Sequence, residues 1–238
     1  PDIMSIWLTL PGAGLDFQAG QYVNVTIPGV EGTRAFSLAS SPAQTNEIEL
    51  HVRLVPGGVG TTWLHGNLKI GDSLPFTGPL GRFYVRRSAE KPLIFLAGGS
   101  GLSSPKSMIL DLLESGYEEE ITLLHGARRP HDLHFADLFR ELEENHENLR
   151  YLPVVSQPEA EDGWTGETGY VHEAAGRLFG GKFSGHQAYL CGPPPMIDAA
   201  ITALMQGRLF ERDIFMERFY TAADGAEGTQ RSALFKRI

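Results

Sequence analysis

The stretch P-L-I-F-L-A-G-G-S-G-L, residues 92–102, decides the fold of the second half of the chain. Its apolar residues run without interruption up to a glycine-rich turn, which is typical of a strand buried on both faces. An apolar face over residues 107–113 predicts a helix directly after the turn. Such a turn admits a phosphate group, because glycines allow close approach and the helix N-terminus favours an anion. A plain glycine-rich turn remains an alternative, since the G-x-G-x-x-G fingerprint is absent.

The alternation of strand and helix continues to the end of the chain. Apolar strands are predicted at 121–124, 151–155, 188–191 and 214–219, and helices at 135–142, 171–179 and 195–205. This order predicts a doubly wound parallel sheet with helices on both faces. The second domain is therefore predicted to span residues 89–238, including a C-terminal tail from residue 222.

The first half of the chain has a different texture. Short β-rich runs at 3–10, 21–27, 34–40 and 48–55 are separated by Gly- and Pro-containing turns, and one short helix is predicted at 61–68. Such spacing predicts an antiparallel barrel or sandwich. The composition changes near residues 88–91, so the first domain is predicted to span residues 1–88.

Bulk properties exclude several classes of function. The 238 residues carry a net charge of −9, which argues against a nucleic-acid or anionic-membrane binder. The lone Cys191 allows neither an internal disulfide nor a four-thiolate iron–sulfur cluster, and it fits the reducing cytoplasm. No histidine pair has metal-ligand spacing, so no metal site is expected. No apolar run is long enough to span a membrane. The start, Pro1-Asp2-Ile3, suggests a piece of a longer protein.

Two further motifs point to ligand chemistry. The motif C-G-P-P-P-M, residues 191–196, joins a predicted strand to a helix, where ligands bind in open α/β sheets. Alternatively, its cysteine is a small buried hydrophobe. In R-A-F-S, residues 34–37, Arg34 and Phe36 share a face and suit a phosphate attached to a flat ring. A surface arginine beside a half-buried phenylalanine is the alternative, and Ser37 reaches the same ligand only at a twist or strand end.

A third stretch, residues 58–62, predicts a second phosphate cradle. Its glycines precede a short helix whose first amides have no partner within the helix. A turn capped by a threonine is the alternative. In contrast, His131, Asp132 and His134 are interpreted as a solvated loop.

Taken in order, the motifs resemble those of the ferredoxin–NADP reductase superfamily. The resemblance is closest to the reductase component of bacterial multicomponent phenol hydroxylases. It covers about residues 18–220. The motifs that carry it are R-A-F-S, a glycine-rich turn into T-T, G-P-L-G-R-F, A-G-G-S-G-L, H-G-A-R, C-G-P-P-P-M and E-R-F. Relatives often have a proline where this chain has Ser104.

The resemblance implies a Greek-key β-barrel that binds FAD, followed by a nicotinamide-binding domain. Ser37, Cys191 and Glu217 are implied as catalytic residues. The residues implied for FAD are Arg34, Ala35, Phe36, Ser37, His51, Val52, Arg53, Gly60, Thr61, Thr62 and Phe219. Those implied for NAD are Gly99, Ser100, Gly101, Leu102, Gly126, Ala127, Arg128, Cys191, Gly192, Pro193 and Met196.

The function implied is electron transfer from NADH through FAD, singly, to a [2Fe–2S] centre that feeds an aromatic monooxygenase. That centre is expected on an N-terminal ferredoxin domain outside this chain or on a partner, and an oxygenase component is the further partner. NADPH remains open if Arg128 and Arg129 hold a 2′-phosphate. Two alternatives are a stand-alone flavin or ferredoxin reductase and a flavin-bearing module that does not turn over.

Overall fold

The first domain is built from antiparallel strands and one helix. The computed structural model describes residues 2–220, so the predicted C-terminal tail lies outside the described residues. The elements of this domain are β1 (Ile3–Thr9), β2 (Tyr22–Thr26), β3 (Thr33–Ser37), β4 (Glu47–Arg53), α1 (Val59–Asn67) and β5 (Phe76–Leu80).

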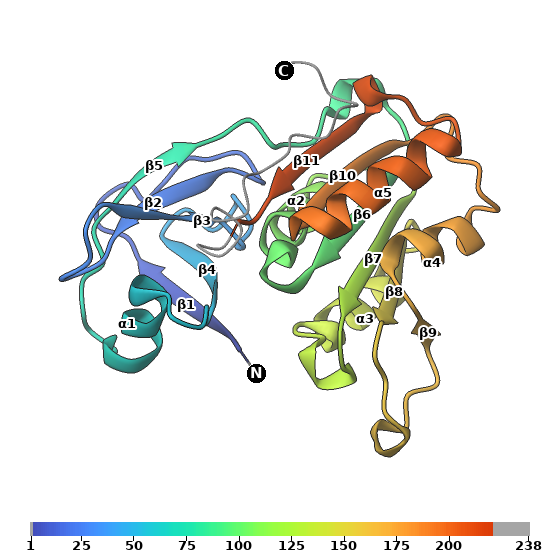
Figure 1. Cartoon of the computed structure of the whole chain (residues 1–238). Helices are drawn as coiled ribbons and strands as arrows, with labels where there is room; N and C mark the ends of the chain where they lie inside the picture. The colour runs from blue at the N-terminus through green and yellow to red at the C-terminus, as the bar shows by residue number, and fades with distance from the viewer. Residues whose placement is uncertain (1, 221–238) are drawn as a thin grey trace.

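Two small sheets enclose one apolar core in this domain (Figure 1). Strand β1 pairs with β4, and β2 pairs with β3 on one side and β5 on the other, all antiparallel. A bridge between Leu38 and Leu50 joins the two sheets. Alternate residues such as Val23 and Val25 are fully buried, as one buried face per strand requires. The predicted antiparallel β domain is confirmed.

The second domain alternates strands and helices. Its elements are β6 (Leu93–Gly98), α2 (Ser103–Glu114), β7 (Ile121–Ala127), α3 (Ala136–Asn145), β8 (Leu149–Val155), β9 (Glu167–Thr168), α4 (Val171–Leu178), β10 (Gln187–Gly192), α5 (Pro194–Gln206) and β11 (Ile214–Arg218). Short 3-10 turns lie at Arg87–Ala89, Gly99–Leu102, Pro130–Asp132, Ala160–Asp162 and Glu211–Asp213.

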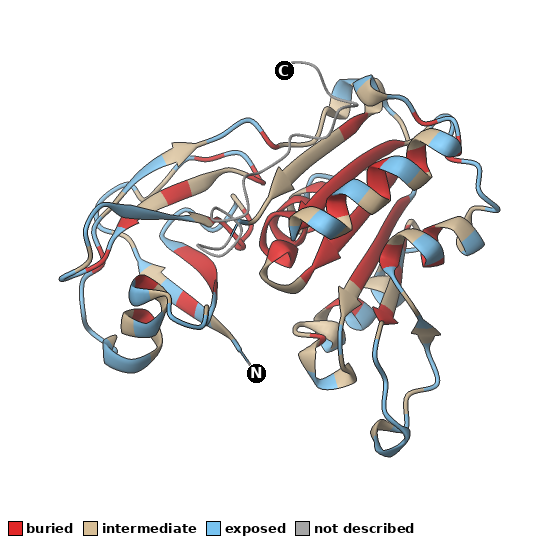
Figure 2. Ribbon diagram, in the orientation of Figure 1, coloured by how far each residue is buried: buried red, intermediate tan, exposed pale blue. Residues whose placement is uncertain are grey.

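All six strands of the second sheet are parallel, in the order β11-β10-β6-β7-β8-β9. Phe95 on β6 packs in one apolar cluster with α2 and α3, whereas its neighbour Leu96 packs in the other with α4 and α5. Helices therefore cover both faces, and β6, β7 and β10 are the most buried part of the molecule (Figure 2). The predicted doubly wound sheet is confirmed.

The order in which strands are added to the sheet reverses between β6 and β10. The chain runs outward from β6 to β9 on one side and returns to β10 and β11 on the other. In open α/β sheets, ligands bind at the carboxyl ends of the strands where the order reverses. This fold therefore places the glycine-rich turn and the Cys191 motif beside each other.

Helix α2 of the second domain packs against the first domain. It begins at Ser103, four residues before the predicted start, because Pro105 lies in the first turn, where its missing N–H costs no hydrogen bond. Ser107 Oγ donates to the carbonyl of Ser40 at 2.6 Å, and Lys106 Nζ to that of Ala39 at 3.2 Å.

The predicted domain boundary at residue 88 stays a prediction. Across residues 2–220, no helix has the length and apolar content of a membrane span.

Candidate active site

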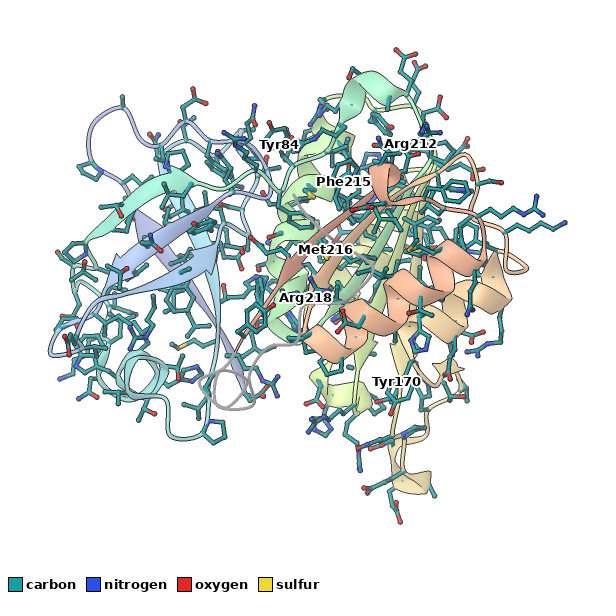
Figure 3. All side chains as sticks on the ribbon, turned by 45° about the horizontal axis from the view of Figure 1, so that its top comes forward. Tyr84, Tyr170, Arg212, Phe215, Met216 and Arg218 are labelled. Atoms are coloured by element: carbon teal, nitrogen blue, oxygen red, sulfur yellow. The ribbon has the colours of Figure 1, made fainter. Side chains whose placement is uncertain are left out.

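Three neighbouring strand ends bring the predicted residues of the second domain together. Cys191 on β10 is in register with Ala97 on β6 and with Glu217 on β11. Residues in register on parallel strands project to the same face. For Cys191 this is the face covered by α2, whose first turn carries Ser104. Figure 3 shows the carboxyl end of β11, marked by Met216 and Arg218, directed towards the first domain.

The carboxylate of Glu217 is one of the points at which the two domains meet. Its Oε2 atom lies 3.0 Å from Ser37 Oγ at the end of β3, and 3.0 Å from Ser104 Oγ on α2. Cys191 Sγ lies 3.9 Å from the same oxygen. Ser37 is the last residue of its strand, which is how its side chain reaches across. The three predicted catalytic residues are therefore brought together.

Burial determines the protonation of this cluster. It raises the pKa of Glu217, although hydrogen bonds from Ser104, Ser37 and Cys191 act in the opposite direction. Burial also raises the pKa of the Cys191 thiol well above its usual value, and the neighbouring carboxylate adds to this effect. Cys191 is thus a neutral thiol at pH 7, which suits packing against an apolar ring and not nucleophilic attack.

The glycine-rich turn after β6 is shaped by close backbone approaches. Gly99 has a φ of +55°, a conformation that other residues rarely adopt. A Cβ atom on Gly101 would lie 2.4 Å from the carbonyl oxygen of Cys191. Gly126 at the end of β7 is in register with Gly98. The following predicted NAD residues lie in these three strand ends and the segments that follow them: Gly99, Ser100, Gly101, Leu102, Gly126, Ala127, Arg128, Cys191, Gly192, Pro193 and Met196.

Arg34 lies over the start of α1. A Cβ atom on Gly60 would lie 3.3 Å from Arg34 Cγ, so the strand arginine and the helix N-terminus form one cradle. Gly58 is the N-cap, without any side-chain cap, so the alternative of a threonine N-cap is wrong. Thr61 Oγ1 instead accepts a hydrogen bond from the Val55 amide at 3.1 Å. Arg34 is exposed and donates to two local carbonyl oxygens, those of Glu31 and Thr33.

Other predicted FAD residues have neighbours of their own. Phe36 packs partly against the core of the first domain, while Ala35 beside it is exposed. The Val52 carbonyl accepts a hydrogen bond from His65 Nε2 at 2.9 Å. Arg53 forms an ion pair with Asp2 at 2.7 Å.

His51 belongs to a buried polar network between the domains. Its Nε2 atom is 3.2 Å from Glu49 Oε1, and its ring stacks on Phe135 with centroids 4.8 Å apart. The half-buried ring of His134 meets the His51 ring edge to face, with the two centroids 5.5 Å apart. The prediction of a solvated loop is therefore wrong for His134, because the loop before α3 packs against the first domain. Burial lowers the pKa of His134 to about 4, so it is neutral at pH 7.

The network also contains two residues that the sequence did not single out. Glu49 on β4 pairs with Lys106 on α2, and both side chains are buried. Ser5 Oγ donates to Glu49 Oε1 at 2.6 Å. In the sequence, Glu49 is only one polar position within the β-rich run 48–55. The one available signal is a lysine in the first turn of a helix whose other residues up to Leu110 are uncharged.

Comparison with known proteins agrees with this arrangement. The description "Oxidoreductase FAD-binding domain" matches residues 1–84, and "Oxidoreductase NAD-binding domain" matches residues 95–202. The chain belongs to the ferredoxin–NADP reductase-like family of FAD- and NAD-binding reductases. One similar protein is the phenol 2-monooxygenase reductase component DmpP of Pseudomonas sp. strain CF600, 61% identical over 94% of this chain and 64% of that protein.

Two further members of the reductase family extend the comparison. The phenol hydroxylase P5 protein of Acinetobacter pittii strain PHEA-2 is 56% identical over 100% of this chain and 67% of its own length. The crystal structure of the Amycolatopsis reductase GcoB has a TM-score of 0.85 and 34% identity, covering 92% of this chain and 65% of that one. The chain thus spans about two thirds of the length of these relatives.

The residues present fit the cofactors of the reductase family. Because Gly60 has no side chain, Arg34 lies directly over the N-terminus of α1, so the guanidinium group and the first amides of the helix suit the FAD pyrophosphate. Gly99 places no side chain at the start of the turn after β6, and Gly101 lets the turn lie directly against the backbone of Cys191, so the two strand ends can together hold a dinucleotide. Within residues 2–220, no group of three or more His, Cys, Asp or Glu side chains is arranged to hold a metal ion.

Proposed function

We propose that this chain is the FAD- and NADH-binding part of a phenol-hydroxylase-type reductase. It would oxidise NADH and pass the electrons singly to a [2Fe–2S] centre. The observation that carries the proposal is the meeting of Ser37, Cys191 and Glu217 between the two cofactor-binding domains. The identity to two phenol hydroxylase proteins supports the choice of oxygenase.

In this proposal the protein orients two rings, and the flavin, when bound, supplies the conversion of hydride transfer into single-electron transfer. Arg34 and the N-terminus of α1 bind the FAD pyrophosphate. Ser37 presents a hydroxyl to the flavin edge, and Cys191 gives the nicotinamide an uncharged surface. Because Ser37 and Cys191 are buried, they also exclude water from the contact. Hydride transfer needs reacting atoms within about 3.5 Å, so this alignment is the main contribution of the chain.

NADH is the preferred dinucleotide in this proposal. Arg129 is ion-paired with Glu159 and with Asp162, the latter at 3.2 Å, so its charge is already balanced by two carboxylates. Only Arg128 of the two arginines is left exposed to meet a 2′-phosphate. A single arginine gives a weaker phosphate site than the pair that NADPH recognition would use.

The electron acceptor is proposed to lie outside this chain. About one third of the length of these relatives lies outside the matched segment, and we place the [2Fe–2S] ferredoxin domain in that additional length or on a partner protein. An oxygenase component for phenol-type aromatic compounds would follow. The lone buried cysteine agrees with a cytoplasmic location, where thiols stay reduced.

Steady-state turnover tests the proposed function. The purified, FAD-loaded chain should reduce the one-electron acceptor ferricyanide with NADH, and kcat/KM should be higher for NADH than for NADPH. An Arg129→Ala variant should not reverse this preference, because Arg129 is committed to its acidic partners. A chain that binds no FAD, or that prefers NADPH, would contradict the proposal.

A further inference from the structure

The hydroxyl of Ser104 has no role among the residues implied by the family resemblance. Ser104 is fully buried in the first turn of α2. Its Oγ atom lies 3.0 Å from Glu217 Oε2 on β11, which is 113 residues away in the chain. The contact is therefore a tertiary one, made where the glycine-rich turn leads into the helix.

A serine in the first turn of a helix usually bonds to its own backbone. Ser103, the preceding residue, does this, because its Oγ donates to the Ser100 carbonyl at 2.9 Å. The hydroxyl of Ser104 is directed away from its own helix and towards a carboxylate. The two neighbouring serines are thus equally buried but make different contacts.

The contact involves Glu217 Oε2, an oxygen atom to which side chains of both domains form hydrogen bonds. Ser37 Oγ, from the first domain, is 3.0 Å from the same Oε2 atom. A carboxylate oxygen has lone pairs for both hydroxyls. We propose that Ser104 is a positioning residue of the active site: its hydroxyl holds the Glu217 carboxyl group where Ser37 meets it. This inference rests on the proposed function for its catalytic consequence but not for the contact itself.

The surroundings of Glu217 make the contact measurable by titration. Cys191 faces the carboxyl group from β10 as a neutral thiol. Ser37 and Ser104 face it from β3 and α2, and neither is charged. Arg218, the next residue on β11, is paired with Asp198 at 2.6 Å. The hydroxyls of Ser104 and Ser37, followed by the Cys191 thiol, are therefore what favour the charged form of Glu217 against its burial.

The test compares three variants of the FAD-loaded protein. Ser104→Ala removes the hydroxyl, Ser104→Thr retains it, and Ser103→Ala is the matched control on the neighbouring serine. The protonation of Glu217 is followed without NADH by the infrared carboxyl band, identified by its absence in Glu217→Gln. In Ser104→Ala the midpoint should lie about one to two pH units higher than in the wild type. Ser104→Thr should restore it, and Ser103→Ala should leave it unchanged.

The pH profile of flavin reduction by NADH provides the second readout. Its limb controlled by Glu217 should move in the same direction in Ser104→Ala, at unchanged flavin content. Equal midpoints in Ser104→Ala and the wild type would overturn the inference, as would an equal displacement in Ser103→Ala. If Ser104→Ala does not fold, Ser104→Cys, which keeps the shape but donates weakly, replaces it with the same expectation. Absence of flavin reduction in the wild type would refute the proposed function, whereas the infrared titration would still report on Ser104.

Discussion

Replacing Lys106 by methionine should weaken the contact between the two domains more than any surface substitution. Lys106 Nζ lies 2.5 Å from Glu49 Oε2, and their side chains are 5% and 0% exposed. The substitution keeps an unbranched side chain that is one atom shorter, and it removes the ammonium group together with its hydrogen bond to the Ala39 carbonyl. Glu49 would then remain buried with hydrogen bonds from Ser5 and His51 but without a cation.

The size of the expected loss of stability follows from the lowered pKa of Glu49. In spite of burial, its hydrogen bonds with His51 and the charge of Lys106 lower its pKa from 4.5 to about 2. A depression of that size corresponds to about 3 kcal/mol of folded-state stability at pH 7. Removing one partner of a buried ion pair costs about 3–5 kcal/mol. We therefore expect Lys106→Met to lower the free energy of unfolding by about 3 kcal/mol at pH 7.

The pH dependence gives this prediction a definite sign. In the wild type the folded pKa of Glu49 is depressed, so its contribution is present above pH 4.5 and is lost as the pH falls towards 2. Without Lys106, burial dominates and the pKa of Glu49 rises. Protonation then relieves the buried charge, and the difference in stability between variant and wild type should shrink as the pH falls below 4.5.

Urea-induced unfolding followed by circular dichroism at pH 7 and at pH 4 provides the assay. Lys91→Met is the control, because Lys91 pairs with Asp213 at a site where the lysine is 32% exposed and should cost less than about 1 kcal/mol. Lys106→Met combined with Glu49→Leu should recover part of the loss. A loss below about 1 kcal/mol for Lys106→Met at pH 7 would refute the reasoning.

Three further predictions concern the site itself. Cys191→Ala should slow flavin reduction by about 10- to 100-fold in stopped flow, because ring alignment suffers while FAD stays bound; equal rates would contradict its assignment. Arg34→Ala should weaken FAD binding by at least about tenfold, seen as a lower flavin-to-protein ratio after purification, unlike the control Arg140→Ala. Gly101→Ala places a Cβ atom 2.4 Å from a backbone oxygen and should lower the melting temperature, whereas Gly176→Ala, with open space around it, should not.

The sequence was sufficient for the architecture because each domain repeats a strong local pattern. The uninterrupted apolar run of β6 and the glycines after it predict a parallel strand and its turn. Where the prediction failed, the local pattern was short or ambiguous. Strand β9 has two residues, too few for any periodicity, and the start of α2 was hidden by Pro105.

The site was only partly predictable, because its contacts join distant segments. Motifs identify Ser37, Cys191 and Glu217, and the structure places the first two around the carboxylate of the third. Ser104 and Lys106 were not identified, since a serine and a lysine near a helix start have many ordinary roles. Their function depends on partners 113 and 57 residues away, which no local pattern reveals.

The most direct test of the account is the absorbance of the oxidised flavin after anaerobic mixing of the FAD-loaded chain with NADH. If the nicotinamide and flavin rings meet between Ser37 and Cys191, the yellow colour should bleach completely in the first turnover. The rate should fall when the transferred hydrogen of NADH is replaced by deuterium. Flavin that is bound but keeps its absorbance in excess NADH would contradict the account.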